Sequence, residues 1–274
     1  MSTKKKNISL VLVLALGSLC GFLFLSLRAQ TSPDDAKISI EKDLNDWRKE
    51  SRSTFPIVEY TDQKLSGTYQ KSDAYRKAKS QKYGRIPVLD SSASYDNEEM
   101  VYSHWASGLS ALPVEQSDAI LVGTVTEALA FLSDNRVSVF SEFNISIEKI
   151  IKSNAIDGLK ADGCVAAERE GGIVRYPSGI ETWFHVSDQS MPTEKHRYLF
   201  FLTHTFPELG VQEKDFHILT AYEINNGTII PLDRPGGGTH PIARKYKGKS
   251  TSVVLDDLSS ILKGEPTDRL KNED

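Results

Sequence analysis

Few side chains in this sequence have the types and spacing that catalysis requires. Ser146 and Lys149 spell the motif S-x-x-K, whose chemistry needs both side chains on one helical face. The residues around them alternate between apolar and polar with the period of a β-strand, so we expect the two side chains on opposite faces. The motifs G-x-S-x-G, H-E-x-x-H and G-x-x-x-x-G-K-[ST] are missing from the sequence. No catalytic residue is therefore predicted.

Histidines and carboxylates are weaker candidates for a site. His185 and His217 lie on expected strands that could bring them together, but no histidine pair has the spacing of a metal site. Asp188 and Asp215 are the carboxylates that a hydrolase of unrecognised type would combine with a nearby histidine. The glycine-rich stretch 234–240 follows no strand-to-helix junction and is predicted to be a mobile loop. We predict neither a metal nor a cofactor.

The N-terminus carries the strongest pattern in the sequence. Three lysines at positions 4–6 precede an uncharged apolar run from Ile8 to Leu27, and a helix of that length spans about 30 Å of hydrocarbon. Leu27 stands where a signal peptidase site needs a small residue, so residues 1–29 are predicted to be an uncleaved signal anchor. The lysines place the N-terminus in the cytoplasm and the bulk of this single-pass protein in the extracytoplasmic space. Secretion after signal cleavage is the alternative.

Residues 30–115 are polar and weakly patterned, and we interpret them as a partly helical linker with a short helix over 34–50. Within them, residues 64–85 are basic and contain three tyrosines. A solvated linker is the preferred interpretation, and a surface that binds nucleic acid or another polyanion is the alternative. The formal net charge of -4 favours no nucleic-acid partner for the chain as a whole.

Residues 116–233 have the pattern of a β-domain. Val139, Phe143, Ile145 and Ile147 alternate with polar residues, and the turn residues 133–136 before them predict a hairpin with the strand that starts at 118. Further strands are expected at 163–169, 173–176, 180–186, 198–202, 216–224 and 228–232. The last two flank Asn225-Asn226-Gly227, which predicts a second hairpin.

The last segment, 234–274, is expected to contain the mobile loop and a C-terminal amphipathic helix that Ser250 or Thr251 caps. Cys164, at the start of a strand, is predicted to be a small buried side chain. The chain is therefore expected to be mainly β, with an N-terminal transmembrane helix, the linker, and a C-terminal helix. A small antiparallel barrel of the OB type is preferred for the β-domain, and a β-sandwich is the alternative.

One strand offers a candidate binding surface. If Phe184 and Val186 face the core, then Glu181, Trp183 and His185 face outward, and an outward tryptophan among polar neighbours is a common recognition element. The alternative is that residues 30–115 or the C-terminal helix cover Trp183.

Six blocks of sequence carry a resemblance. In chain order they are SDAILVGTVTEA (117–128), SEF (141–143), GGIVRYPSG (171–179), RYLFFL (197–202), DFHILTAYE (215–223) and PLD (231–233). Together they resemble a group of uncharacterised bacterial exported or membrane-anchored proteins, which brings no activity or residue role. More distantly, the first hairpin is similar to the barrel of netrin-like and metalloprotease-inhibitor modules, although the cysteines of those modules are absent here.

These patterns favour a membrane-tethered extracytoplasmic β-domain that acts as a non-catalytic binding module for a protein or an envelope component. Membrane contact is expected through residues 8–27. An extracytoplasmic hydrolase and a structural envelope protein are the two alternatives. The sequence by itself names neither the partner nor the oligomeric state.

Overall fold

The computed structural model describes residues 46, 49–61, 79–83, 99–102, 106, 108–154, 159–205 and 215–264. The chain divides into two compact units, Met1–Trp47 and Arg48–Asp274, and the fold below is that of the second unit. The predicted membrane span, Ile8 to Leu27, lies outside the described residues, as does most of the helix expected at 34–50. Within the described ranges, no helix combines the length and the apolar character needed to cross a bilayer.

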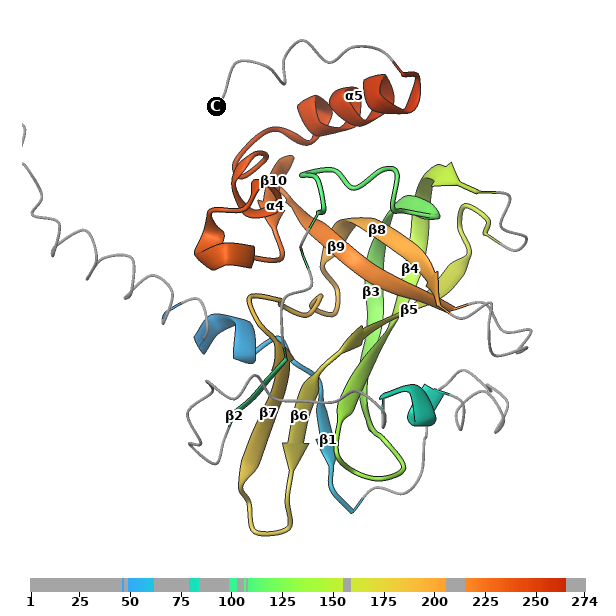
Figure 1. Cartoon of the computed structure of the whole chain (residues 1–274). Coiled ribbons are helices and arrows are strands. Elements are labelled where there is room, and N and C mark those ends of the chain that lie inside the picture. Colours follow the sequence, from blue (N-terminus) through green and yellow to red (C-terminus); the bar gives the residue numbers. More distant parts are fainter. Residues whose placement is uncertain are drawn as a thin grey trace, which may run out of the picture. The chain divides into compact units, whose positions relative to one another are not determined.

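The fold is mainly β, as predicted, and contains two sheets (Figure 1). The larger sheet has the strand order β10-β9-β5-β4-β3-β8, and β9 also pairs with β8. Five strands therefore close into a ring. The strands of this sheet are β3 (Ala119–Leu132), β4 (Val139–Ser153), β5 (Cys164–Glu170), β8 (Arg197–Thr205), β9 (Asp215–Asn225) and β10 (Thr228–Pro231).

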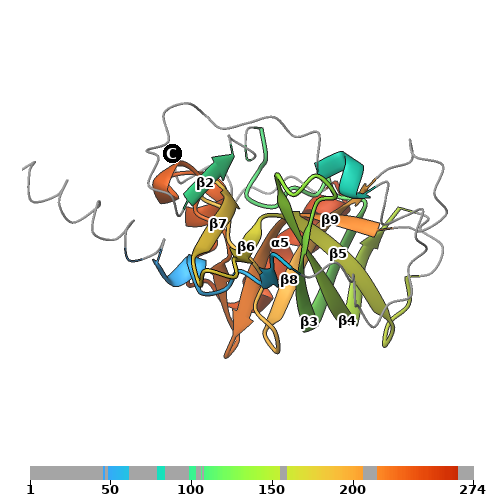
Figure 2. The same ribbon diagram turned by 90° about the horizontal axis from the view of Figure 1, so that it is seen from below.

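The smaller sheet has the order β1-β6-β7-β2, and Figure 2 shows its strands beside those of the ring. Its strands are β1 (Ile57–Glu59), β2 (Glu99–Tyr102), β6 (Gly172–Arg175) and β7 (Glu181–Val186). β1 pairs in parallel with β6, and β2 pairs in parallel with β7. Residues 57–59 and 99–102 are thus part of the folded β-structure and not of a linker. Strands of three and four residues are too short to show a clear period in the sequence.

A single glycine connects β5 of the larger sheet to β6 of the smaller sheet. β5 ends at Glu170, β6 begins at Gly172, and Gly171 between them has a φ of +111°. A Cβ atom built on Gly171 would lie 2.7 Å from the carbonyl oxygen of Phe184. Only glycine therefore fits at the point where the chain leaves the ring and enters the smaller sheet.

Both predicted hairpins are confirmed. β3 and β4 pair in antiparallel fashion over their whole length, with three irregularities in the register. β9 and β10 form the second hairpin. Its two loop residues, Asn226 and Gly227, have φ values of 48° and 78°, and positive φ at both positions is what a type I′ turn requires.

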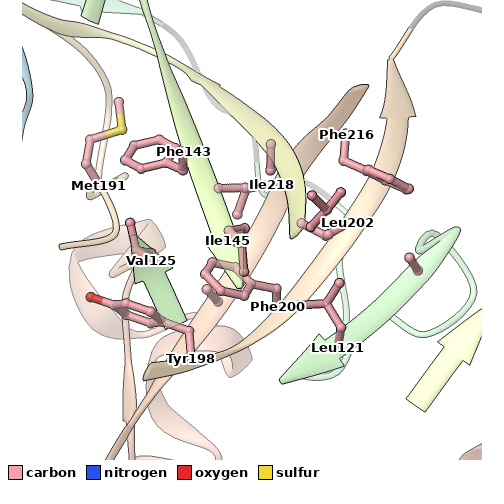
Figure 3. Packing of buried hydrophobic residues seen from close by; sticks show 14 of the residues in the cluster. Leu121, Val125, Phe143, Ile145, Met191, Tyr198, Phe200, Leu202, Phe216 and Ile218 are labelled. Carbon is pink, nitrogen blue, oxygen red and sulfur yellow. The ribbon is translucent and has the colours of Figure 1, made fainter. Parts of the chain in front are cut away.

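The ring encloses an apolar core to which all five of its strands contribute. Figure 3 shows side chains of this core from β3, β4, β8 and β9. The inward positions of β4 are the alternating residues that the sequence indicates, Phe143, Ile145 and Ile147, and all three are buried. A second cluster lies between the outer side of β3, β8 and β9 and the C-terminal helix α5 (Thr251–Leu262). A third lies between the smaller sheet and the ends of β3 and β4.

The C-terminal helix agrees with its prediction. Ser250 is the N-cap of α5, and its side chain accepts a hydrogen bond from the Val253 backbone nitrogen. Val254 and Leu258 are fully buried in the second cluster. The preceding stretch, expected to be a loop, forms the 3₁₀-helix η2 (Pro235–Gly238) and the short helix α4 (Pro241–Arg244).

Candidate functional site

The tryptophan strand is buried. Trp183 and His185 are each 5% exposed, and their rings stack with centroids 3.8 Å apart. The expectation that they face solvent is therefore wrong. Phe55 packs edge-on against Trp183 at 5.3 Å, so the alternative, coverage by residues 30–115, is confirmed. β7 has apolar clusters on both of its sides. An alternating sequence identifies an exposed face only where one side of the strand is in contact with water, so the alternation in β7 did not reveal that both sides are buried.

The third member of that candidate surface, Glu181, stays partly exposed. It forms an ion pair with Arg175 at 2.8 Å. Arg175 also contacts Glu59 of β1 at 3.0 Å, so the three side chains link β1, β6 and β7 at the surface. Ion pairs that are exposed to water in this way contribute little to stability. They join neighbouring strands and do not create a recognition surface around the tryptophan.

The other chemical candidates are not brought together. Ser146 and Lys149 lie on strand β4, as expected, and His185 and His217 lie in different sheets. Asp188 is in a turn, where its carboxylate accepts a hydrogen bond from the Gly237 backbone nitrogen at 3.4 Å.

Two further points concern metal and thiol chemistry. In the part of the chain that the structure describes, no three His, Cys, Asp or Glu side chains form a group that could hold a metal ion. The side chain of Asp215 lies outside that part. Cys164 is a free thiol and is exposed, which corrects the prediction that it is buried. It is the first residue of β5, beyond the part of the strand that contributes to the core.

Ionisable residues do gather on the outer side of the ring. Glu142 of β4 is paired with Glu168 of β5, and Glu168 is paired with His217 of β9. Paired residues on neighbouring strands point to the same side of a sheet, and the residues that alternate with these three point into the core. Glu170 lies two residues along β5, beside Phe140. We call these four ionisable residues, Glu142, Glu168, Glu170 and His217, the carboxylate face.

A single helical turn, residues 79–83, covers this face, and we call it the covering turn. Lys79 forms ion pairs with both Glu142 and Glu168. Lys82 contacts Glu168 at 3.1 Å, and the Tyr83 hydroxyl donates a hydrogen bond to the same carboxylate at 2.8 Å. Lys79 is 2% exposed and Glu168 is fully buried, so the ion pair between these two residues is shielded from water.

The β3–β4 hairpin also holds the covering turn. The Tyr83 ring stacks on Phe140 with centroids 4.7 Å apart. Ser138 donates a side-chain hydrogen bond to the Tyr83 carbonyl oxygen at 2.7 Å, and the Asp134 backbone nitrogen donates to the Ser80 hydroxyl. For these five residues the expectation of a solvated basic linker is wrong. The rest of the basic stretch lies outside the described residues.

Burial and charge shift three pKa values within the carboxylate face. Burial by itself raises the pKa of Glu168, but the adjacent Lys79 and Lys82 outweigh it and lower the pKa to about 2. Burial raises the pKa of Glu170 to about 7, with Lys82 acting in the opposite direction. Burial also lowers the pKa of His217 to about 4, although the charge of Glu168 opposes the shift.

The face therefore holds one ionised carboxylate, Glu168, beside two groups that favour their neutral forms, Glu170 and His217. Oε1 of Glu170 and Nδ1 of His217 are buried and have no hydrogen-bond partner among the described residues. The paired carboxylates are suited to holding ammonium groups, and Phe140 provides an aromatic surface beside them. Sequence alternation places these residues outside the core, but it gave no sign that they would be covered.

A second ionic centre is structural. Arg169, the neighbour of Glu168 on the opposite side of β5, is fully buried and forms a two-pronged ion pair with Asp233 at 2.7 and 2.8 Å. Asp233 also accepts hydrogen bonds from the Ser190 backbone nitrogen and the Thr220 hydroxyl. Both oxygens of the Asp233 carboxylate therefore accept hydrogen bonds from Arg169 and from one further donor. Through these bonds the pair links β5, β9 and the chain after β7. No local pattern in the sequence predicts this pair, although Arg169 occupies an inward position on β5.

Comparison with known proteins adds no functional assignment. The sequence matches no protein-family model and no curated protein. The resemblance to bacterial exported proteins therefore stays a prediction that rests on the six sequence blocks.

Proposed function

We propose that this chain is a membrane-tethered extracytoplasmic binding module whose ring of five strands is a barrel of the OB type. Strand order supports the fold. In chain order, the first strand of the ring pairs with the second and the fourth, and the fifth pairs with the third and the fourth. This is the connectivity of a five-stranded Greek-key barrel. OB barrels bind their ligands on the face of their second and third strands, which correspond here to β4 and β5.

The proposed ligand is a protein or a polypeptide part of the envelope, bound at the carboxylate face without catalysis. One observation carries this proposal: the face already holds a piece of polypeptide, the covering turn, through specific side-chain contacts. The carboxylates of Glu142 and Glu168 disfavour phosphate groups, so a nucleic acid is not the proposed partner.

A cross-linking experiment tests the binding function. A photo-crosslinking amino acid at Ala166, an outward position of β5 next to Glu168, should yield a discrete adduct in membranes that contain the full-length protein. The matched control is the same amino acid at Val253, which is exposed on α5. A specific adduct from Ala166 alone supports the binding module. Adducts from neither position, or the same adducts from both, contradict it and favour the structural envelope protein.

The topology has its own test. The thiol of Cys164 is exposed, so a membrane-impermeant maleimide should label it in intact cells if the bulk of the chain is extracytoplasmic. Resistance of the protein to alkaline extraction of membranes would support the uncleaved anchor at residues 8–27, and release into the medium would support cleavage. Labelling that requires cell lysis contradicts the proposed topology.

A further inference from the structure

The covering turn contacts the carboxylate face through one side of a helix. Its three contacting side chains are Lys79, Lys82 and Tyr83, at the spacing i, i+3 and i+4 that brings residues to the same helical face. Gln81, on the other side of the turn, is exposed. The contact is therefore a small example of a helix docked by anchor residues, a common mode of peptide recognition.

The face requires a cationic cover. Glu142 and Glu168 are neighbours across β4 and β5, and Lys79 and Lys82 both form ion pairs with Glu168. An apolar cover would bury these carboxylates without compensation, which is strongly unfavourable. Any polypeptide that replaces the covering turn must therefore present ammonium or guanidinium groups in similar positions.

The covering turn lies outside the three apolar clusters of the fold. Tyr83 is buried, yet none of the three apolar clusters contains a residue from positions 79–83. Short helical segments are marginal in water, so the contacts with the face support the helical conformation of residues 79–83. Substitution of the side chains in the turn would leave the contacts within the three clusters in place and would remove the stacking of Tyr83 on Phe140.

On the basis of the proposed function, we propose that the partner docks on the carboxylate face with a cationic helical segment of the pattern Lys-x-x-Lys-Tyr, in place of the covering turn. In this scheme residues 79–83 are an internal occupant that competes with the partner. The pattern of the partner follows from charge complementarity with Glu142 and Glu168 and from the aromatic surface of Phe140.

A peptide-binding experiment tests this proposal with the full-length protein in mild detergent. The probe is a fluorescein-labelled synthetic peptide of residues 74–86, AYRKAKSQKYGRI, measured by fluorescence anisotropy. A variant with Lys79→Ala, Lys82→Ala and Tyr83→Ala uncovers the face and should bind the peptide at least about tenfold more tightly than the unmodified protein does. A control peptide with alanine at positions 79 and 82 keeps the other basic residues and should lose at least about tenfold in affinity.

Two further variants make the result decisive. Glu168→Gln, added to the uncovered variant, should abolish the preference for the lysine-containing peptide. If the triple variant does not fold, the single variant Lys82→Ala takes its place. The side chain of Lys82 is 29% exposed, and its loss should still strengthen the binding of the peptide. The proposal is overturned if folded variants, judged by circular dichroism, bind both peptides alike or no more tightly than the unmodified protein.

The two proposals fail in different ways. An Ala166 adduct without any peptide binding would keep the binding module and reject the cationic helical partner. If the peptide binds but no Ala166 adduct forms, the proposed specificity of the carboxylate face is supported. The proposal that this face binds a partner in the membrane is then rejected. If both are correct, an excess of the synthetic peptide should suppress the Ala166 adduct.

Discussion

Replacement of Glu170 by glutamine should reveal two opposing pH effects in the carboxylate face. Glu170 is half-buried at the end of β5, and its Oε1 has no hydrogen-bond partner among the described residues. Its pKa is raised from 4.5 to about 7, whereas that of His217 is lowered from 6.5 to about 4. Glutamine keeps the shape of the protonated side chain and cannot ionise.

The sign of each effect follows from proton binding. The folded state binds the Glu170 proton more tightly than the unfolded state does, so stability falls as the pH rises from about 4.5 to about 7. For His217 the folded state binds the proton more weakly, so stability is gained as the pH rises from about 4 to about 6.5. Each shift corresponds to at most about 3 kcal/mol, and solvent near these half-buried groups reduces it.

In the unmodified protein, the pH dependence of stability due to Glu170 and that due to His217 nearly cancel over the pH range where both groups titrate. Glu170→Gln removes the falling slope, so the free energy of unfolding should rise between about pH 4.5 and 6.5 and be higher near pH 7.5 by up to about 3 kcal/mol. His217→Asn should have the opposite result, with stability falling over the same range.

Urea denaturation of the full-length chain in mild detergent, followed by circular dichroism across this pH range, measures both slopes. Glu115→Gln is the matched control, because Glu115 is exposed. An unchanged slope in Glu170→Gln, or a loss of stability near neutral pH, would refute the assignment of a buried, protonated carboxyl at this position.

Three other substitutions test the fold. Asp233→Asn leaves the buried guanidinium of Arg169 without its counter-charge and should cost about 3–5 kcal/mol in urea denaturation; a cost below about 1 kcal/mol would show that the pair is not buried. Phe55→Ala removes the ring that packs on Trp183 and should cost about 3–5 kcal/mol while shifting tryptophan emission to the red, and unchanged emission would contradict the packing. Gly227→Ala should cost about 1 kcal/mol in thermal unfolding, because its φ is +78° and the space around it is open, so only backbone strain opposes the change.

The elements that the sequence predicted correctly depend on neighbouring residues. The alternation of Phe143, Ile145 and Ile147 marks the inward side of β4, and Asn226-Gly227 supplies the positive φ values of the second hairpin. Ser250 caps α5 as its side-chain type predicts. Each of these signals acts within a few residues, so it can be read without knowledge of the remaining chain.

The elements that the sequence did not reveal depend on distant pairing. β1 and β2 form only because β6 and β7 offer open edges more than 80 residues later in the chain. Trp183 is buried because Phe55 comes from that same early segment and covers the side of β7 that alternation assigned to solvent.

The sequence by itself determined the mainly β composition, the two hairpins, the C-terminal helix and the inward positions of the ring strands. Only the tertiary structure decided that β9 closes the ring against both β5 and β8, and that residues 79–83 cover Glu142 and Glu168. Local patterns set which side of a strand avoids water. The partner that covers the other side depends on contacts between residues far apart in the chain, because burial is a property of the assembled surfaces.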